Sequence, residues 1–439
     1  MPSPGLILAA PSSGSGKTLL TLGLLAHLRR QGVGVVSAKV GPDYIDPAFH
    51  RAATGCDCLN LDAWAMRPQT LAGLVSQSSR HAPLVICEGV MGLLDGAATA
   101  DGQQSGSTAD IAALTGWPVV MIIDARGMAA SAAAVLCGFA QADPRIQVTG
   151  VIFNRVSGDK HRRMIAEACA RLCPGIQILG FVPRLESLTV PSRHLGLVQA
   201  QEHPDLAGFL DRAADAIGQA VDVAALVQLA QPSHLGDAPF CPPLPPLGQH
   251  IAIARDVAFT FAYPALVQGW RQAGAEIRFF SPLNDESPQG DAVYLPGGYP
   301  ELHAERLAQN SRFMGGLRAM AAAGCPIFGE CGGYMVLGRA MTDAKGQAHA
   351  MAGLLPLETS FAQRRLHLGY RLARTQTGSI LGPAGTLFAG HEFHYATILV
   401  EKGQSLFTCS DAMGQDLGAA GLVNGSVAAS FFHLIDQRI

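Results

Sequence analysis

A chain of 439 residues is longer than one hydrophobic core usually supports, so two domains of roughly 200 residues each are expected. Hydrophobic residues make up 49% of the sequence and charged residues 15%, which is typical of folded globular proteins and excludes a largely disordered chain. The formal net charge is −3 and the basic residues form no cluster. Nucleic acid is therefore not expected as a partner, because binding to its phosphate backbone needs clustered Lys and Arg.

The sequence indicates neither secretion nor membrane insertion. The opening residues, MPSPGLILAAPSSGSGKT, carry no charged leader segment, and their apolar stretch runs directly into a glycine-rich loop. The run MAASAAAVLCGFA, residues 128–140, is too short and too rich in Ala to cross a bilayer. Ten cysteines without a regular spacing indicate reduced thiols, so we expect a cytoplasmic protein.

The first half of the chain alternates short apolar runs with segments of helical period. Residues 18–31 have the apolar spacing of a helix, which Gly32 would end. Continuous apolar strands separated by helices predict a parallel sheet that is covered on both faces, an α/β doubly wound domain. The expected strands are GLILAA (5–10), VGVVSAK (33–39), PLVIC (83–87), PVVMIID (118–124), VTGVIFN (148–154) and IQILGFV (176–182).

A proline-rich segment divides the chain. Residues 231–248, QPSHLGDAPFCPPLPPLG, hold six prolines, which fit neither a helix nor a central strand, so the segment is interpreted as a semi-rigid linker. The predicted domains are therefore residues 1–230 and 249–439. A second α/β pattern follows the linker, with expected strands in IAIARD (251–256), EIRFF (276–280), AVYLPGG (292–298) and CPIFGECGG (325–333).

The first candidate site is a phosphate-binding loop, PSSGSGKT, residues 11–18, between an expected strand and an expected helix. In such a loop glycines let backbone amides turn towards an oxyanion, the Lys reaches the β- and γ-phosphates and the Thr hydroxyl ligates Mg²⁺. Pro11 stands where the usual pattern begins with Gly. The predicted ATP-binding residues are Ser13, Gly14, Ser15, Gly16, Lys17, Thr18 and, at the end of a later strand, Asn154. Asn154 would bond the adenine edge or, alternatively, stabilise a turn.

Polar residues follow two further strands of this domain. Glu88 ends the strand PLVIC and Asp95 lies in the next loop, where open α/β sheets bind ligands. The loop KVGPDYIDPAFH, residues 39–50, carries Asp43, Tyr44 and Asp46 between two prolines, although a solvated turn would have the same composition. Because Mg²⁺ prefers oxygen ligands, Thr18, Glu88 and Asp43 are the predicted metal ligands.

The second candidate site is the stretch IFGECGGYMVLG, residues 327–338. GECGG fits G-x-C-x-G, in which small residues allow a sharp strand-to-helix turn that presents Cys331. The helix N-terminus should lower the pKa of this thiol. Gly297 and Gly298 in LPGGYPELH offer backbone amides for an oxyanion hole, and His433 in AASFFHLID is the candidate base.

These motifs resemble two known groups. GECGGY, LPGGYPELH and the late His resemble class I glutamine amidotransferase domains, which are flavodoxin-like. Together with GSGKT, KVGPDYIDPAFH, EGVMGLLDG and GHEFHYA (390–396), the chain resembles the cobyrinate and hydrogenobyrinate a,c-diamide synthases from about residue 5 to residue 436. ARDVAF, GWRQAGAEIRFFSPL and PGGYPELHA are most similar to members that act on metal-free hydrogenobyrinate. The two histidines of HEFHYA lack the HExxH spacing, and a strand running into a loop is expected there.

The resemblance implies a glutamine-dependent ligase of cobalamin biosynthesis that uses ATP and Mg²⁺. Cys331 would attack the glutamine amide with help from His433, while Gly297, Gly298 and Gly332 would bind glutamine and its oxyanion. Ammonia would pass internally to the first domain and displace phosphate from a corrinoid acyl phosphate. Asp43, Tyr44, Asp46 and Asp95 would form the substrate and acyl-phosphate site. The implied partners are small molecules, with no membrane, and a homodimer is possible.

Two points stay open in this resemblance. Class I glutaminases commonly end in H-x-E, whereas HLID offers only Asp436, so the third member of the Cys–His pair is not assigned. The acidic macrocycle needs cationic partners, for which Arg51, Arg126, Arg155 and Arg193 are candidates, or else surface residues.

Several alternative functions remain besides the metal-free substrate. They are the cobalt-containing cobyrinate, a cobyric acid synthase, a partitioning ATPase and a catalytically inactive scaffold. The partitioning ATPases carry a Lys where this loop has Ser12, which disfavours them.

Overall fold

The computed structural model describes residues 1–439 except 1–2, 101–103, 186–187, 189–191, 194–195 and 439. Its contacts divide the chain into two compact units, whose main boundary lies between Phe240 and Cys241. Ala65–Arg67, although early in the chain, belongs to the second unit. The proline-rich segment 231–248 contains no helix or strand beyond a single bridge between Gln231 and Gly5.

The first unit is built on a seven-stranded sheet in the order β3-β2-β4-β1-β5-β6-β7. All neighbouring pairs are parallel. The strands are β1 (Gly5–Ala9), β2 (Val36–Val40), β3 (Leu59–Leu61), β4 (Val85–Glu88), β5 (Val119–Asp124), β6 (Val148–Val156) and β7 (Gln177–Pro183). The six expected strands are confirmed, and β3 was missed because three residues give no readable period.

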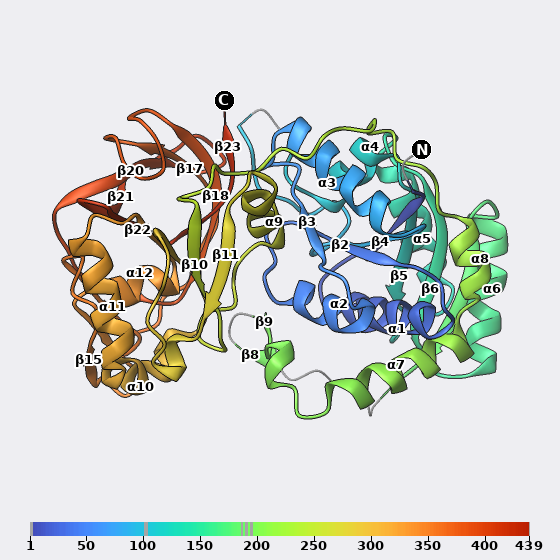
Figure 1. Ribbon diagram of the computed structural model, residues 1–439. Helices are drawn as coiled ribbons and strands as arrows, with labels where there is room; N and C mark the ends of the chain where they lie inside the picture. Colours follow the sequence, from blue (N-terminus) through green and yellow to red (C-terminus); the bar gives the residue numbers. More distant parts are fainter. Residues whose placement is uncertain (1–2, 101–103, 186–187, 189–191, 194–195, 439) are drawn as a thin grey trace. The chain divides into compact units, whose positions relative to one another are not determined.

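Helices cover this sheet on both faces, so its central strands are buried on both sides. In Figure 1, α1, α2 and α7 lie along one face, and α3 and α4 lie on the other. The helices are α1 (Lys17–Arg30), α2 (Asp46–Thr54), α3 (Pro68–His81), α4 (Thr108–Thr115), α5 (Ser131–Ala142), α6 (Asp159–Leu172), α7 (Leu206–Ala220) and α8 (Val223–Gln228). A 3₁₀ turn, η1 (Ala200–Glu202), and a small ribbon of β8 (Ser192–Arg193) and β9 (Gly196–Leu197) complete the unit.

The second unit begins with a parallel sheet. Its strands are β10 (His250–Ala254), β11 (Glu276–Phe280), β12 (Ala292–Leu295), β13 (Ile327–Glu330) and β22 (Val427–Ser430). They lie in the order β11-β10-β12-β13-β22, and every neighbouring pair is parallel. This is the flavodoxin-like order, which confirms the predicted fold class.

The same sheet continues past β22 as antiparallel strands, which the α/β pattern of the sequence did not predict. The added strands follow in the order β21-β20-β17-β18-β23. They are β17 (His367–Thr375), β18 (Leu387–His394), β20 (Gln404–Ser410), β21 (Asp416–Asn424) and β23 (Phe432–Arg438). β18 ends at His394 and runs into a loop, as expected for HEFHYA.

The remaining elements of the second unit pack around this sheet. A four-stranded sheet consists of β14 (Ala340–Thr342), β15 (Ala348–Ala350), β16 (Leu357–Ser360) and β19 (Thr397–Glu401). The helices are α9 (Pro264–Gln272), α10 (Ala304–Gln309), α11 (Ser311–Ala322) and α12 (Gly332–Leu337), with 3₁₀ turns η2 (Pro282–Asn284) and η3 (Pro300–His303). Residues of α11, α12 and the parallel strands form one hydrophobic core, which includes Phe313, Leu317 and Tyr334.

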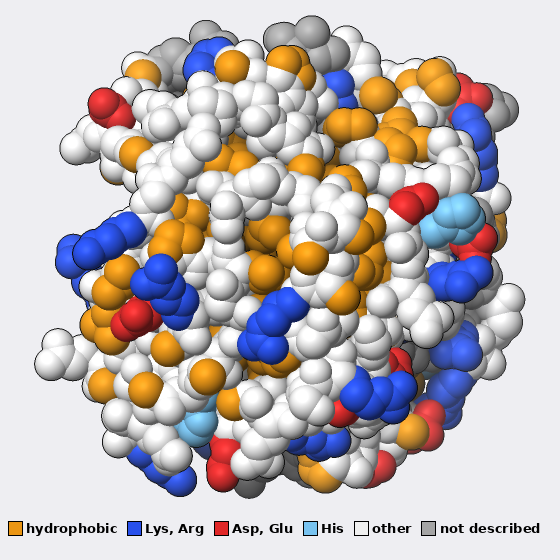
Figure 2. All heavy atoms as spheres, turned by 60° about the vertical axis from the view of Figure 1, so that its left-hand side comes forward, with side chains coloured by type: hydrophobic (Ala, Val, Ile, Leu, Met, Phe, Trp, Pro, Cys, Tyr) orange, Lys and Arg blue, Asp and Glu red, His pale blue; other side chains and the backbone are white. Residues whose placement is uncertain are grey.

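The surface carries apolar and charged side chains, and the cysteines form no disulfides. On the face in Figure 2, hydrophobic side chains gather near the middle, and Lys and Arg side chains are dispersed around them with Asp and Glu between. All ten cysteines are free thiols. Among the described residues, none of the helices combines the length and apolar character needed to cross a membrane.

Candidate functional site

The phosphate loop joins β1 to α1 and is held from the neighbouring strand β6. Gly16 has φ 96°, a left-handed conformation that favours glycine, and a Cβ there would collide with the amide of Asn154. Asn154 Nδ2 donates to the carbonyl of Ser15 (2.9 Å), and its Oδ1 accepts from the backbone N–H of Arg155 (2.9 Å). Asn154 thus shapes the loop with both ends of its amide. The predicted bond to adenine would compete with these contacts.

Other loop residues have the exposure that a phosphate cradle requires. Ser13 and Gly14 are exposed, and the buried Ser15 bonds the carbonyl of Ser12 (2.9 Å). Lys17 Nζ donates to the carbonyl of Met91 and, at 3.4 Å, to that of Ser12. Burial lowers the pKa of Lys17 to about 8, although the charge of Glu88 raises it in part. A bound anion would therefore favour the charged form of this amine.

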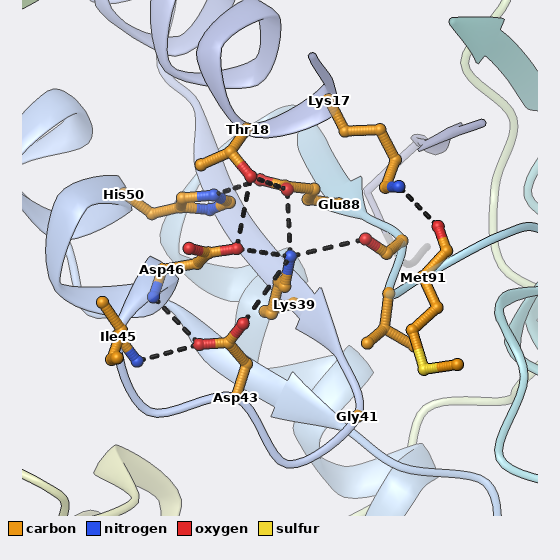
Figure 3. A network of polar contacts seen from close by, with 12 residues as sticks. Lys17, Thr18, Lys39, Gly41, Asp43, Ile45, Asp46, His50, Glu88 and Met91 are labelled. Atoms are coloured by element: carbon orange, nitrogen blue, oxygen red, sulfur yellow. Dashed lines mark hydrogen bonds and ion pairs between the residues drawn. The ribbon is translucent and has the colours of Figure 1, made fainter. Parts of the chain in front are cut away.

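A compact charged network lies beside the loop, at the carboxyl ends of β2 and β4 (Figure 3). Thr18 Oγ1 donates to Glu88 Oε1 (2.7 Å) and to Asp46 Oδ2 (3.3 Å). Lys39 Nζ lies between the same two carboxylates, 2.7 Å from Asp46 Oδ2 and 2.9 Å from Glu88 Oε1. Asp46, Glu88 and Lys39 are all buried, so their charges interact with little screening by water.

The pKa values of the network follow from this pairing. Burial disfavours the charged form of Lys39, but the carboxylates of Asp46 and Glu88 raise its pKa well above the ordinary value. Burial, together with the neighbouring Asp43, raises the pKa of Asp46 to about 7. For Glu88 the attraction of Lys39 and the hydrogen bond from His50 outweigh burial and lower the pKa. Glu88 is therefore the carboxylate that stays ionised.

His50 is a member of this network that the sequence analysis did not single out. Its Nε2 lies 2.7 Å from Glu88 Oε2, and its Nδ1 lies 3.5 Å from the thiol of Cys58. Although burial lowers the pKa of His50, Cys58 and Glu88 raise it to about 10. Asp46 and His50 are four residues apart in α2, so they share one face of the helix. That spacing was the signal available in the sequence. Lys39 begins the loop KVGPDYIDPAFH, but no role was predicted for it.

The other predicted residues of this region lie at the edge of the network or in turns. Asp43 Oδ1 accepts from the backbone N–H groups of Ile45 (2.8 Å) and Asp46 (3.0 Å), and its Oδ2 is 4.0 Å from Lys39 Nζ. Tyr44 is half-buried in the same loop. Asp95 Oδ2 accepts from Gly92 N (2.8 Å) within its own turn. The structure thus brings Asp46 to Thr18, whereas the sequence analysis named Asp43 as the metal ligand.

The candidate corrinoid-binding arginines are dispersed. Arg51 lies 3.2 Å from Asp57, and Arg126 and Arg155 both pair with Asp124. Arg155 also donates to the carbonyl of Gly14 in the phosphate loop (2.9 Å). Arg193 is in β8, and its side chain is outside the described part of the chain. Arg155 is thus the candidate whose described side chain contacts the phosphate loop.

In the second unit, Cys331 occupies the turn between β13 and α12. Its φ of 49° and ψ of −103° are strained for a non-glycine residue, which fits the predicted elbow. The side chain is only 3% exposed. The expected lowering of the Cys331 pKa is wrong: burial and the charge of Glu301 raise that pKa, and the N–H of Gly332 offsets only part of the rise.

Cys331, His433 and the glycine loop after β12 come together. The position that a Cβ on Gly297 would take is 3.0 Å from His433 Nε2 and 3.1 Å from Cys331 Cβ. The position of a Cβ on Gly332 is 3.2 Å from the backbone N of Gly298. All five residues predicted from the sequence for this site therefore converge on one place, although β12, β13 and β23 are far apart in the chain.

His433 lies in β23, where it pairs in register with His391 of β18. Burial, and then the charges of His391 and His394, lower the pKa of His433 to about 3. The imidazole is therefore neutral at physiological pH and has a lone pair for a proton from the thiol.

Asp436, the acidic residue that follows His433, has a different partner. Its Oδ1 lies 2.7 Å from Arg67 Nη2, and its Oδ2 accepts from the backbone N–H of Arg67 at 2.7 Å. The carboxylate closest to the imidazole in an ion-pair geometry is instead Glu330, whose Oε2 lies 3.9 Å from His433 Nδ1. Glu330 is part of the motif GECGG, but no role was predicted for its carboxylate.

A further histidine–carboxylate group lies on β17 and β18. Donor atoms of His367, Glu392 and His394 lie within 4.8 Å of one another. Glu392 Oε2 already accepts from Arg371 Nε (2.8 Å), and His394 Nε2 lies 2.9 Å from Glu392 Oε1. The guanidinium of Arg371 balances the charge of the carboxylate.

Family models match both halves of the chain. Residues 6–198 match the CobQ/CobB/MinD/ParA nucleotide binding domain, and residues 250–438 match the CobB/CobQ-like glutamine amidotransferase domain. A crystal structure of a glutamine amidotransferase covers 42% of this chain and 89% of its own, with 14% identity and a TM-score of 0.28. The TM-score is too low to carry an argument.

Similar proteins extend over nearly the whole chain. Proteins named hydrogenobyrinate a,c-diamide synthase are 52% identical in Brucella anthropi (98% of each chain) and 48% identical in Rhizobium meliloti (98% of this chain, 99% of that one). A third, from Mesorhizobium japonicum, is 47% identical over 99% of each chain. Identity at this level over both halves shows common ancestry of the whole molecule. The chain therefore belongs to the hydrogenobyrinate a,c-diamide synthase family.

Proposed function

We propose that this protein is an ATP-dependent ligase that uses glutamine to convert the a- and c-acetate carboxylates of hydrogenobyrinate into amides. The relatives named for this reaction are about half identical over the full length, and this is the observation that carries the proposal. The two candidate sites supply the two chemistries that such a reaction needs: release of ammonia from an amide, and activation of a carboxylate. Its substrates are small molecules and its place is the cytoplasm.

The second unit releases ammonia. His433 accepts the proton of the Cys331 thiol as the sulfur bonds to the side-chain carbonyl carbon of glutamine. Backbone amides of Gly297 and Gly298 stabilise the oxyanion. The C–N bond then breaks, ammonia leaves with the proton that His433 returns, and a thioester remains. Water, deprotonated by His433, hydrolyses the thioester to glutamate and free thiol.

The first unit activates the acid. A carboxylate oxygen of the corrinoid attacks the γ-phosphorus of ATP, the bond to the β-phosphate oxygen breaks and ADP leaves. Ammonia then attacks the acyl carbon and phosphate departs with the C–O bonding pair. Lys17 and the amides of residues 13–16 hold the phosphates, so this unit contributes chiefly position and charge.

The network beside the loop fits Mg²⁺. Thr18, Asp46 and Glu88 direct oxygen atoms towards one point, and oxygen donors are the ligands Mg²⁺ prefers. Lys39 presently supplies the positive charge there, so the two carboxylates already bind a cation. Thr18, Glu88 and Asp46 would hold the ion, with Asp43 at the edge. When bound, Mg²⁺ neutralises charge on the transferring phosphoryl group.

The experiment that tests this function is mass spectrometry of products. The purified protein is incubated with ATP, MgCl₂ and glutamine, and with either metal-free hydrogenobyrinate or cobalt-containing cobyrinate. We expect the metal-free substrate to gain two amide groups. Product from cobyrinate alone would assign the protein to the cobalt-containing pathway, and four amides would assign it to the cobyric acid synthases. No corrinoid product from either substrate would refute the proposal.

A further inference from the structure

Glu330 joins the nucleophile turn to the strand that carries the base. It precedes Cys331 at the end of β13, and its side chain is 1% exposed. Oε1 accepts from the backbone N–H of Leu434 (2.8 Å), the residue after His433. Oε2 accepts from the hydroxyl of Tyr294 on β12 (2.5 Å). The carboxyl group is thus fixed at both oxygens, beside residues that flank both partners of the Cys–His pair.

The two edges of the His433 ring lie against different groups. Nδ1 lies 3.9 Å from Glu330 Oε2, while the opposite edge of the ring, with Cε1 and Nε2, lies against the position of a Cβ on Gly297, which is 3.1 Å from Cys331 Cβ. A general base needs its Nε2 lone pair directed at the thiol, which requires the proton of the neutral ring to be on Nδ1. An oxygen acceptor beside Nδ1 favours that tautomer. Glu330 Oε2 is in the position from which an acceptor would select it.

We propose that Glu330 is the positioning residue of this glutaminase centre: its carboxylate holds the His433 ring by Nδ1 and stabilises the imidazolium that forms when Cys331 loses its proton. This rests on the proposed function. Asp436 is not available for this role, because both of its oxygens bind Arg67.

The charges around the pair are consistent with this role. Tyr294, His433 and Cys331 face Glu330, and the imidazoles of His391 and His394 act on His433. Burial raises the pKa of Glu330 to about 8, against the lowering effect of the bonds from Tyr294 and Leu434. The carboxyl group of Glu330 is therefore ionised above about pH 8, and there it can pair with the imidazolium that forms as His433 takes up the proton of the thiol.

The test compares Glu330→Gln with a matched variant. Glu401→Gln removes the carboxylate of a second tyrosine–glutamate pair in the same unit, in which Tyr334 donates to Glu401. Three quantities are measured: kcat and KM for glutamine hydrolysis, the pH dependence of Cys331 alkylation by iodoacetamide, and corrinoid amidation with ammonium chloride in place of glutamine. The last needs no glutaminase and reports whether the first unit is folded, so near-UV circular dichroism is recorded as well to show that the second unit is folded.

For Glu330→Gln we expect kcat to fall on the order of 100-fold with KM changed less than about threefold, because only orientation and charge in the transition state are lost. The pH profile of Cys331 alkylation should shift, because the charge of Glu330 acts on this thiol, whereas amidation from ammonium chloride should stay unchanged. Glu401→Gln should behave as wild type. Wild-type kcat and an unchanged alkylation profile in Glu330→Gln would overturn the proposal.

A second variant covers loss of folding. If Glu330→Gln also loses ammonium-dependent amidation, Glu330→Asp decides, because it retains the carboxylate. Partial recovery of kcat in Glu330→Asp supports the proposal. The proposal is overturned if Glu330→Asp hydrolyses glutamine as weakly as Cys331→Ala while its ammonium-dependent amidation is normal. If wild type amidates no corrinoid from either nitrogen source, the proposed function fails. Hydrolysis and alkylation still test Glu330 in that case.

Discussion

Lys39 is the positive charge at the centre of the network in the first unit. It bonds both Asp46 and Glu88, and all three side chains are buried. Removing one partner of a buried ion pair leaves an uncompensated charge, which is costly, whereas a metal ion could replace the missing charge. The stability of a Lys39 variant should therefore depend on Mg²⁺.

We predict that Lys39→Met lowers the free energy of unfolding by about 3 kcal/mol without metal, and that MgCl₂ restores part of it. Urea unfolding with and without MgCl₂ measures both effects. The control is Lys160→Met, which removes an exposed lysine of α6. Equal unfolding curves for the two variants would show that Lys39 does not balance the carboxylates.

Gly297 lies between the base and the thiol of the second site. A Cβ would lie 3.0 Å from His433 Nε2 and 3.1 Å from Cys331 Cβ, so it would push the base from the thiol. We predict that Gly297→Ala lowers kcat of glutamine hydrolysis on the order of 100-fold, because displacements near 1 Å have effects of that size. Amidation from ammonium chloride should continue. Gly315→Ala, at an exposed position of α11 with open space around it, is the control. Equal hydrolysis by both variants would contradict the geometry.

At the scale of elements, β23 presents two functional groups to different surroundings. His433 near its start faces the nucleophile turn, and Asp436 binds Arg67. Asp436 is fully buried and the Arg67 side chain is 14% exposed, so this pair is shielded from water. Its role is therefore expected to be structural.

We predict that Asp436→Asn lowers the free energy of unfolding by about 3 kcal/mol. The kcat of glutamine hydrolysis per folded molecule should stay within about twofold of wild type. Denaturant unfolding and a glutaminase assay at low temperature separate the two effects. Glu276→Gln, which breaks an exposed pair with Arg278 (2.9 Å), should cost about 0.5 kcal/mol or less. If Asp436→Asn lost glutamine hydrolysis as fully as Cys331→Ala, Asp436 would have to be counted among the catalytic residues.

At the scale of the whole molecule, the two units have separable chemistries. We predict that Cys331→Ala abolishes glutamine-dependent amidation but still forms the diamide from ammonium chloride, because the first unit needs only ammonia. Lys17→Ala should lose amidation from either nitrogen source and keep the glutaminase fold, since Lys17 acts on the phosphates.

Mass spectrometry of corrinoid products and an assay of glutamate release measure the two activities of these variants. Diamide formation by Lys17→Ala would contradict the loop assignment. Failure of Cys331→Ala with ammonium chloride would contradict the division of labour between the units.

The sequence predicted best where a function depends on a few consecutive residues. GSGKT between an apolar run and a helical period specifies a phosphate loop, and GECGG specifies a strained strand-to-helix turn, because short-range sterics decide both. Apart from the strand in HEFHYA, the antiparallel strands of the second unit were not predicted. Their side chains are buried irregularly, as in β17, so their sequence has no clear period of two.

The fold class and both loops follow from the sequence, which also predicted the thiol and the imidazole that the second unit brings together. Only the tertiary structure decided which polar groups meet: Lys39 and His50 with Glu88, Arg67 with Asp436, and Glu330 with His433. These pairs join residues of different elements, and sheet order and burial set their distances. Burial also reversed the expected pKa shift of Cys331, because the cost of removing a charge from water depends on the surrounding packed chain, which no local pattern contains.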